Sequence, residues 1–270
     1  LFEKVFGVKF EYSNNPWKSD YIGIGSILQW TCPKGIGIKG RILNTIRYLL
    51  GKKGKILVLS AGFRDKPNIH TGFYREMEFK IVRGRLTEKW LLDNGLIKGH
   101  VLVGDLGLLS PYLVKTEIQK KYKLGIIPHF KDMSSSLIWD IYKQHEKNCL
   151  MINVHDNPEM VIRQIASCES VVSSSLHGLI VADSFGIPNL WIENRWKMDI
   201  EPLFKYLDYY SALGITEIKP VQAFDFLYSS IDIIKNQYKI DFKIVKSKQE
   251  ELYHFCNDYF RKNCECARIT

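Results

Sequence analysis

Short apolar runs alternate with longer stretches of mixed character along most of the chain. Each run is rich in Ile, Val and Leu, which is typical of strands that are covered on both faces of a sheet. The runs predict two series of strands, the first at 21–25, 55–60, 79–82 and 101–103 and the second at 124–127, 149–154, 170–173 and 189–192.

Helical patterns fill the intervals between the predicted strands. The predicted helices are 133–147, 158–167 and 176–185, with two further amphipathic helices near 221–238 and 247–262. Asn157 stands where a helix N-cap is expected, and Thr87 is placed to cap a helix that runs through Asn94. The alternation of strand and helix predicts right-handed crossovers and a doubly wound α/β fold.

The polar stretch Gln119–Lys123 separates the two series of strands. A chain of 270 residues is long enough for two domains of modest size. We therefore predict two Rossmann-like lobes with parallel sheets, residues 1–122 and 123–270. A central cleft between the carboxyl ends of their strands is where such sheets bind ligands.

Composition and charge narrow the class of protein. Lys and Arg number 38 against 29 Asp and Glu, a net charge of +9, and the basic residues are dispersed. An anionic small substrate or an anionic surface fits this charge better than nucleic acid does. No apolar run approaches the ~20 residues that cross a bilayer. Six scattered cysteines without a secretion signal are typical of reduced thiols in a cytoplasmic protein.

The strongest local motif is Ser173-Ser174-Ser175-Leu176-His177-Gly178, which follows a predicted strand and opens a predicted helix. The N–H groups and positive dipole end of a helix start bind phosphate or carboxylate, and serine hydroxyls add donors. His177, in the first turn, is placed to move a proton near neutral pH. Gly178 leaves room for a ligand to approach the backbone. The alternative is that the serines cap the helix and that His177 is a packed histidine.

Three further polar residues follow predicted strands and are candidates for the same cleft. Arg83 is suited to bidentate capture of a carboxylate or phosphate. Asp105 is a candidate for binding sugar hydroxyls, or else it caps a turn. His129 follows the strand at 124–127. No paired metal-ligand spacing occurs, so no catalytic metal is expected.

Five motifs share a characteristic order along the chain. They are Asp20-Tyr21-Ile22-Gly23-Ile24-Gly25-Ser26, Val82-Arg83-Gly84, Val103-Gly104-Asp105, Ile127-Pro128-His129 and the stretch Ser173–Pro188. In this order the chain resembles the polysaccharide pyruvyl transferase family, in its bacterial exopolysaccharide and capsule branch. The resemblance covers roughly residues 1–215, and the Ser-x-x-Leu-His-Gly segment is its most specific part.

The resemblance implies a GT-B-like fold, with the acceptor on the N-terminal lobe and the donor on the C-terminal lobe. Family members use phosphoenolpyruvate to place a pyruvate ketal on two hydroxyls of a sugar, and they release phosphate. The implied acceptor is a lipid-linked sugar of a capsule or exopolysaccharide repeat unit. Many relatives carry a further segment upstream of the part where this chain starts, so we expect residues to precede Leu1.

The resemblance also implies roles for individual residues. His177 is expected to be the general acid or base. The expected donor-binding residues are Arg83, His129, Ser173, Ser174, Ser175, Leu176, Gly178, Arg195 and Lys197, and the expected acceptor-binding residues are Gly25, Ser26 and Asp105. Many relatives carry Arg two residues before the histidine, where this chain has Ser175. We expect Arg195 and Lys197 to supply the missing positive charge.

These expectations define cofactors, partners and place of action. No cofactor and no metal are required beyond phosphoenolpyruvate as the donor substrate. The expected partners are phosphoenolpyruvate and a lipid-linked sugar acceptor, with peripheral contact to the inner membrane and no nucleic acid. The expected location is the cytoplasm, at the cytoplasmic face of that membrane.

Two other functions stay open at this point. A glycosyltransferase of the same two-lobe architecture would use a nucleotide sugar and would need a ribose-binding carboxylate, for which Glu193 or Glu201 would serve. A degenerate, non-catalytic protein that binds anionic glycans would fit the replacement of the common Arg by Ser175. Products formed from phosphoenolpyruvate or from a nucleotide sugar would separate the three functions.

Overall fold

The computed structural model describes most of the chain, and the described residues form two compact units. The described residues are 1–13, 15, 18–32, 42, 46, 49–50, 54–67, 73, 75–194 and 203–263. The N-terminal unit comprises Lys9–Leu106 and Pro202–Thr216. The C-terminal unit comprises Leu1–Val8, Gly107–Glu201 and Glu217–Thr270.

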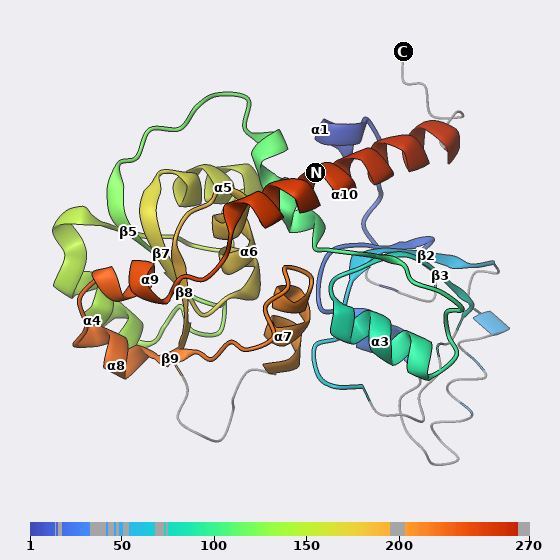
Figure 1. Ribbon diagram of the computed structural model, residues 1–270, viewed down its shortest axis with the longest axis horizontal. Helices are drawn as coiled ribbons and strands as arrows, with labels where there is room; N and C mark the ends of the chain where they lie inside the picture. Colours follow the sequence, from blue (N-terminus) through green and yellow to red (C-terminus); the bar gives the residue numbers. More distant parts are fainter. Residues whose placement is uncertain are drawn as a thin grey trace. The chain divides into compact units, whose positions relative to one another are not determined.

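The N-terminal unit is built on a parallel sheet in the order β1-β2-β3-β4. Its strands are β1 (Tyr21–Ile22), β2 (Ile56–Ala61), β3 (Met77–Val82) and β4 (Leu102–Val103). Its described helices are the short 3₁₀ helix η1 (Leu28–Thr31) and the α-helices α3 (Arg85–Asp93) and α7 (Leu203–Ser211) (Figure 1). In the core between sheet and helices, the rings of Phe63 and Trp90 meet edge to face with centroids 4.9 Å apart.

The C-terminal unit contains a parallel sheet in the order β6-β5-β7-β8-β9. Its strands are β5 (Tyr122–Ile127), β6 (Cys149–Met151), β7 (Cys168–Ser173), β8 (Asn189–Glu193) and β9 (Val221–Gln222). Ile126 of β5 packs with one group of buried side chains, and its neighbour Ile127 packs with another. Successive side chains of a strand point to opposite faces, so both faces of this sheet are covered.

Helices cover the two faces of the sheet in the C-terminal unit (Figure 1). One face carries α4 (Ser136–His145), α8 (Ala223–Leu227) and α9 (Asp232–Gln237), and the other carries α5 (Pro158–Ala166) and α6 (Leu176–Ser184). Helix α10 (Phe242–Asn263) packs on α6, and α1 (Phe2–Phe6) packs on α10. The 3₁₀ helices η2 (Leu106–Leu113) and η3 (Glu146–Asn148) precede β5 and β6.

The predicted α/β fold class is confirmed, because both sheets are parallel and described helices lie between most of their consecutive strands. Each predicted strand overlaps an observed one. Asn157 caps α5 as expected, since its Oδ1 accepts a hydrogen bond from the N–H of Glu159 at 3.0 Å. The likeness to GT-B enzymes and the assignment of donor and acceptor lobes stay predictions.

Some local predictions are corrected by the structure. The stretch 221–238 is not one helix but β9, α8 and α9, and Ser230 interrupts it by accepting a hydrogen bond from the N–H of Asp232 at 3.2 Å. Helix α7 was not predicted. The two units also divide the chain after Leu106 rather than after residue 122, and residues 202–216 fall with the N-terminal unit.

Helix α3 is capped by side chains of α7. We predicted Thr87 as the cap, but Thr87 lies inside the helix, which begins at Arg85. The carboxylate Oδ1 of Asp208 accepts a hydrogen bond from the N–H of Thr87 at 2.8 Å, and Ser211 Oγ accepts one from the N–H of Arg85 at 2.9 Å. A helix start needs such acceptors for its unpaired N–H groups. Helix α7 supplies them from more than 100 residues away.

Asp208 also forms a buried ion pair with Arg83. The Nε and Nη2 atoms of Arg83 lie 3.0 and 2.9 Å from Asp208 Oδ2, and both side chains are fully buried. Arg83 further donates hydrogen bonds to Ser26 Oγ and to the carbonyl oxygen of Phe63. Burying two charges is favourable only when the pair and its other hydrogen bonds offset the lost hydration. This cluster joins α7 to α3 and to the segments that follow β1 and β2.

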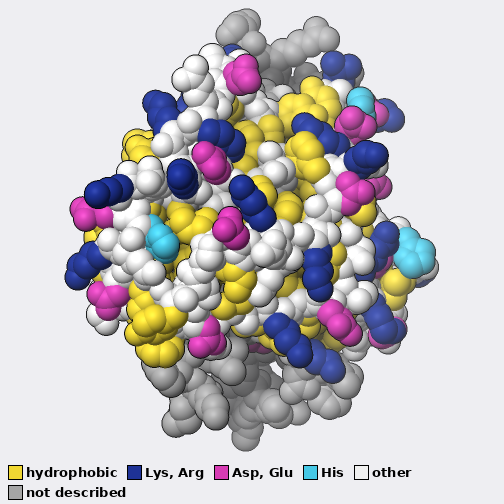
Figure 2. Space-filling view, turned by 60° about the vertical axis from the view of Figure 1, so that its left-hand side comes forward, with side chains coloured by type: hydrophobic (Ala, Val, Ile, Leu, Met, Phe, Trp, Pro, Cys, Tyr) yellow, Lys and Arg dark blue, Asp and Glu magenta, His cyan; other side chains and the backbone are white. Residues whose placement is uncertain are grey.

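The described helices include none that is long and apolar enough to cross a membrane. On the face shown in Figure 2, the described Lys and Arg side chains are interspersed with Asp and Glu. On that face they do not gather into the single basic stripe that is typical of nucleic-acid-binding proteins.

Replacing Asp208 by Asn should destabilise the protein strongly, because it leaves the buried Arg83 guanidinium without a counter-charge. We expect the free energy of unfolding in urea to fall by about 3–5 kcal/mol. The control is Asp93→Asn, which removes an exposed partner of Lys89 and should cost about 1 kcal/mol or less. Equal losses in the two variants would contradict a special role for the buried pair.

Gly84→Ala should also be destabilising, because α7 approaches the backbone at this position. A Cβ at Gly84 would lie 1.7 Å from the carbonyl oxygen of Asp208, so α7 would have to move. We expect a loss of about 3 kcal/mol or more. At Gly99 a Cβ meets nothing within 4 Å, so Gly99→Ala is the matched control and should stay within about 0.5 kcal/mol of wild type. Thermal unfolding of both variants checks this, and a harmless Gly84→Ala would refute it.

Candidate functional site

Polar residues follow the carboxyl ends of neighbouring strands in the C-terminal unit. Strands β5 and β7 are parallel and pair with Ile127 opposite Ser173. The chain therefore leaves both strands at the same edge of the sheet, and it continues into Pro128-His129 and Ser174-Ser175. Strand β8 pairs with β7 and ends next to Asn194. This edge is where open parallel sheets bind ligands.

Ser173 and Gly178 shape the turn between β7 and α6. The buried Ser173 hydroxyl lies 2.8 Å from the carbonyl oxygen of Ile127, and it accepts a hydrogen bond from the N–H of Ser175 at 2.9 Å. A Cβ at Gly178 would lie 2.5 Å from Ser173 Oγ and 2.9 Å from Ile127 Cγ2. Packing inside the protein therefore requires glycine here. This packing reason stands beside the expectation that Gly178 leaves room for a ligand. Leu176 is buried, and donor binding by Leu176 and Gly178 stays a prediction.

Three of the predicted donor residues are accessible at this edge. Ser175 is the half-buried N-cap residue of α6, and its side chain makes no capping hydrogen bond. His177 is exposed in the first turn of the helix. His129 is half-buried, and its ring centroid lies 4.3 Å from that of Phe130. A helix start of this kind attracts an anion through its N–H groups and its dipole.

Ser174 and the buried Asp132 connect the segments after β5 and β7. The Ser174 hydroxyl donates a hydrogen bond to Asp132 Oδ2 at 2.6 Å and accepts one from the N–H of His129 at 2.9 Å. The side chain of Asp132 is only 5% exposed. Sequence reasoning missed this residue, although an Asp in the turn that follows Pro128-His129 was a signal for it. Ser174 thus positions the loop rather than facing outward.

The predicted residues of the N-terminal unit take part in its fold. Arg83 is fully buried, and its guanidinium is bonded to Asp208, Ser26 and Phe63. Asp105 is also fully buried. Gly25 has φ +129°, in the left-handed region that favours glycine. The contacts of Arg83 give it a structural role that uses up its guanidinium, and no contact with the donor is observed for it. Acceptor binding by Gly25, Ser26 and Asp105 stays a prediction.

Ser60 is a strained residue that sequence reasoning did not single out. It lies near the carboxyl end of β2 with φ +71°, a conformation that is uncommon outside glycine. Its hydroxyl donates to the carbonyl oxygen of Gly104 at 2.9 Å and accepts from the N–H of Leu106 at 2.7 Å, so it brackets Asp105. Strained residues cluster at functional sites. No sequence pattern pointed to Ser60, because a Ser within an apolar run is ordinary in a strand.

The described residues also bear on two other kinds of chemistry, a thiolate nucleophile and a cluster of metal ligands. Burial raises the pKa of the Cys149 and Cys168 thiols to about 12, so neither is a thiolate near neutral pH. Across the described part of the chain, no three His, Cys, Asp or Glu side chains are grouped as metal ligands would be. The predicted Arg195 and Lys197 lie outside the described residues, as does Glu201.

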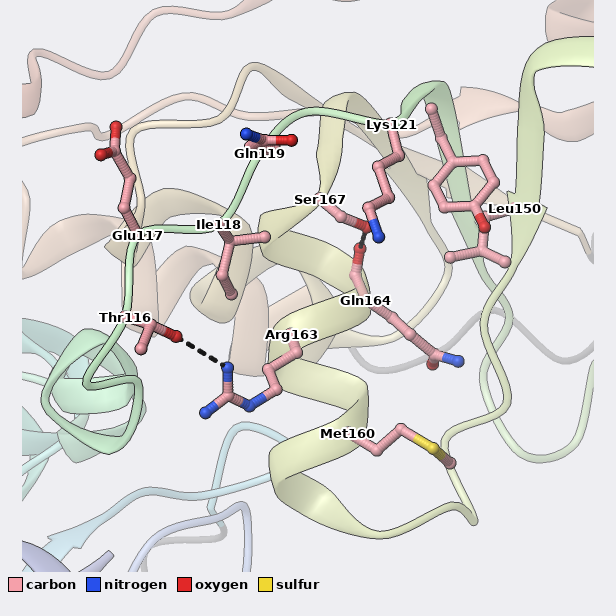
Figure 3. A pocket seen from close by; sticks show the side chains of 11 residues that line it. Thr116, Glu117, Ile118, Gln119, Lys121, Leu150, Met160, Arg163, Gln164 and Ser167 are labelled. Atoms are coloured by element: carbon pink, nitrogen blue, oxygen red, sulfur yellow. Dashed lines mark hydrogen bonds between the residues drawn. The ribbon is translucent and has the colours of Figure 1, made fainter.

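A separate cavity of about 460 Å³ lies between α5 and the segment that leads into β5 (Figure 3). Arg163 of α5 points toward Thr116, with Nη1 and Oγ1 3.4 Å apart. The lining includes Tyr122, the first residue of β5, whereas His129 follows the last. This cavity is therefore at the amino end of β5, away from the residues predicted to bind the donor.

Comparison with known proteins bears on the family. The family model described as polysaccharide pyruvyl transferase matches residues 3–195. An uncharacterized protein of Acanthamoeba polyphaga mimivirus is 32% identical over 141 residues, which are 51% of this chain and 49% of that protein. The succinoglycan biosynthesis protein ExoV of Rhizobium meliloti (strain 1021) is 29% identical over 207 residues, which are 75% of this chain and 60% of ExoV.

The aligned regions cover about half of the viral relative and three fifths of ExoV. The matched stretch 3–195 contains both sets of post-strand residues, including Ser173–Gly178 and the histidines at the edge of the C-terminal sheet. Since the family model matches well over half of the residues, this chain belongs to the polysaccharide pyruvyl transferase family.

Proposed function

We propose that the protein transfers the pyruvyl group of phosphoenolpyruvate to two hydroxyls of a sugar. The sugar belongs to a lipid-linked repeat unit of a capsule or exopolysaccharide. One phosphoenolpyruvate and one sugar diol give one cyclic pyruvate ketal and one phosphate. The two carbon–oxygen bonds of the ketal replace the enol double bond and the bond to phosphate, so no oxidant or reductant is consumed.

The start of α6 is the observation that carries this proposal. An exposed histidine stands in its first turn, beside an N-cap serine whose side chain is not used for capping. Phosphoenolpyruvate combines a phosphate and a carboxylate, and both are anions of the kind that a helix start attracts. A proton source next to that anion matches what its enol carbon needs.

The proposed reaction assigns a task to each accessible residue. The N–H groups at the start of α6 and the Ser175 hydroxyl hold the donor. His177 delivers a proton to the methylene carbon, which creates positive character at the central carbon. One sugar hydroxyl then attacks, phosphate leaves with a proton, and the second hydroxyl closes the ring. His129 is the second candidate for moving a proton between these groups.

Arg83 is given no donor contact in this proposal. Its guanidinium would have to leave Asp208, Ser26 and Phe63 to reach a ligand, and the buried Asp208 would then be unpaired. The positive charge that balances the donor is assigned instead to Arg195 and Lys197. Acceptor binding by Gly25, Ser26 and Asp105 is retained as part of the proposal.

The two alternative functions make different demands on the chain. A nucleotide-sugar enzyme would need a carboxylate exposed to the ribose. Of the two candidates, Glu193 is only 4% exposed, and Glu201 lies outside the described residues. A non-catalytic glycan-binding protein would need no accessible proton-transfer residue, whereas His177 is exposed. Both observations favour pyruvyl transfer.

A direct assay tests the proposed function against both alternatives. The purified protein is incubated with a galactose-terminated lipid-linked acceptor and either phosphoenolpyruvate or a nucleotide sugar. We expect phosphate release from phosphoenolpyruvate, and a product that is heavier by one pyruvic acid less one water. A glycosylated product, or acceptor binding without any product, would reject pyruvyl transfer.

His177→Gln should remove most of the turnover and leave the fold intact, since the side chain is exposed. General acid–base groups contribute about 10²- to 10⁴-fold in rate, and glutamine keeps the polarity without the titration. The control is His254→Gln on α10, which is also exposed and should turn over like wild type. A folded His177→Gln variant with wild-type kcat would show that the histidine is not the proton source.

Removing Arg195 and Lys197 together should weaken donor binding. Each charge-assisted hydrogen bond contributes about 1.5–3 kcal/mol, so the KM for phosphoenolpyruvate should rise at least tenfold. Ser175→Arg in that background should restore part of the affinity, because the Ser175 side chain is not used as a cap. Donor titrations that show unchanged affinity in the double variant would contradict the assignment.

A further inference from the structure

Asp132 places a buried carboxylate among the segments that carry the candidate site. It belongs to the turn after β5, in which its own N–H donates to the carbonyl oxygen of His129 at 2.7 Å. A carboxylate that is only 5% exposed is costly unless hydrogen bonds replace its lost hydration. The donors come from two other segments, Ser174 after β7 and Asn194 after β8.

The Ser174 contact fixes the direction of a hydrogen-bond chain. A hydroxyl has one proton to donate, and Ser174 donates it to Asp132 Oδ2 at 2.6 Å. The Ser174 hydroxyl oxygen then accepts a hydrogen bond from the N–H of His129, with Oγ and N 2.9 Å apart. An ionised carboxylate accepts only, so it holds this direction. Ser174 also donates its N–H to Ile127, one residue before the N-cap of α6.

The Asn194 contact extends this series of hydrogen bonds to α4. The Nδ2 atom of Asn194 lies 3.5 Å from Asp132 Oδ1, and its Oδ1 accepts from Ser135 Oγ at 3.1 Å. Ser135 is the N-cap residue of α4, where its hydroxyl accepts from the N–H of Ile138. One carboxylate therefore links three post-strand segments and the starts of two helices.

We propose that Asp132 is a positioning residue, which holds the start of α6 and the His129 backbone in the geometry that the reaction needs. Its effect on turnover rests on the proposed function. Asp132 acts through Ser174 and Asn194 rather than on the donor. Charge-assisted hydrogen bonds are shorter and stronger than neutral ones, which is what a group that must fix a loop requires.

A second buried carboxylate in the same unit gives the matched control. Asp183 lies near the other end of α6, fully buried, and accepts hydrogen bonds from Asn189 Nδ2 and from the hydroxyl of Tyr238. It supports α6 against β8 and the end of α9, far along the helix from His177. Asp183→Asn thus tests the loss of a buried charge in α6 without touching the loops of the site.

The experiment compares Asp132→Asn, Ser174→Ala, their double variant and Asp183→Asn. Phosphate release from phosphoenolpyruvate gives kcat and KM, urea unfolding gives stability, and amide hydrogen exchange reports the His129 N–H. We expect kcat/KM to fall about 10- to 100-fold in Asp132→Asn and in Ser174→Ala, as small misplacements of reacting groups do. The kcat/KM of the double variant should be no lower than that of the poorer single variant, because both residues act through the same series of hydrogen bonds.

The exchange measurement separates positioning from general stability. The His129 amide should exchange at least tenfold faster in Asp132→Asn, and stay near wild type in Asp183→Asn. A folded Asp132→Asn variant with kcat and KM within twofold of wild type would overturn the proposal, and so would an equal loss of turnover in Asp183→Asn. If wild-type protein releases no phosphate, the proposed function fails by itself. Unchanged exchange at His129 would then overturn the positioning role as well.

Discussion

The candidate site depends on the parallel pairing of β5 with β7. Because Ile127 lies opposite Ser173, the chain leaves both strands at the same level, and the next residues must satisfy each other's backbone groups. Ser174 donates its N–H to the Ile127 carbonyl and uses its hydroxyl for the His129 amide. The same closeness leaves no space for a side chain at Gly178. The serines of the motif therefore satisfy backbone groups that the pairing of β5 with β7 brings together. The exposed His177 follows directly on this turn.

Each unit uses a buried aspartate to join segments that are distant in sequence. Asp132 accepts from Ser174 and Asn194, and Asp208 accepts from Thr87 and pairs with Arg83. The two carboxylates differ in what they hold. The first is surrounded by the loops of the candidate site, and it accepts hydrogen bonds from the neutral side chains of Ser174 and Asn194. The second faces a cation, and its contacts fasten a helix to the sheet of the N-terminal unit.

The sequence was sufficient for features that depend on local pattern. Apolar runs located the strands, and Asn157 located the start of α5, because a cap acts within a few residues. It was not sufficient where a partner is remote. Arg83 after a strand has the pattern of a ligand contact, and only the fold reveals that Asp208, 125 residues later, lies against it. Likewise Thr87 has the composition of a cap, but α7 provides the acceptors.

The return of residues 202–216 to the N-terminal unit has a consequence for the order in which the protein becomes structured during synthesis. The β1–β4 sheet is complete in sequence by residue 103, yet the acceptors for the start of α3 and the counter-ion of Arg83 are translated only at Asp208 and Ser211. A ribosome must therefore add about as many residues again before the first sheet can bury its arginine. Until then, Arg83 has no Asp208 with which to pair, and strands β5 to β8 of the C-terminal sheet are translated in that interval.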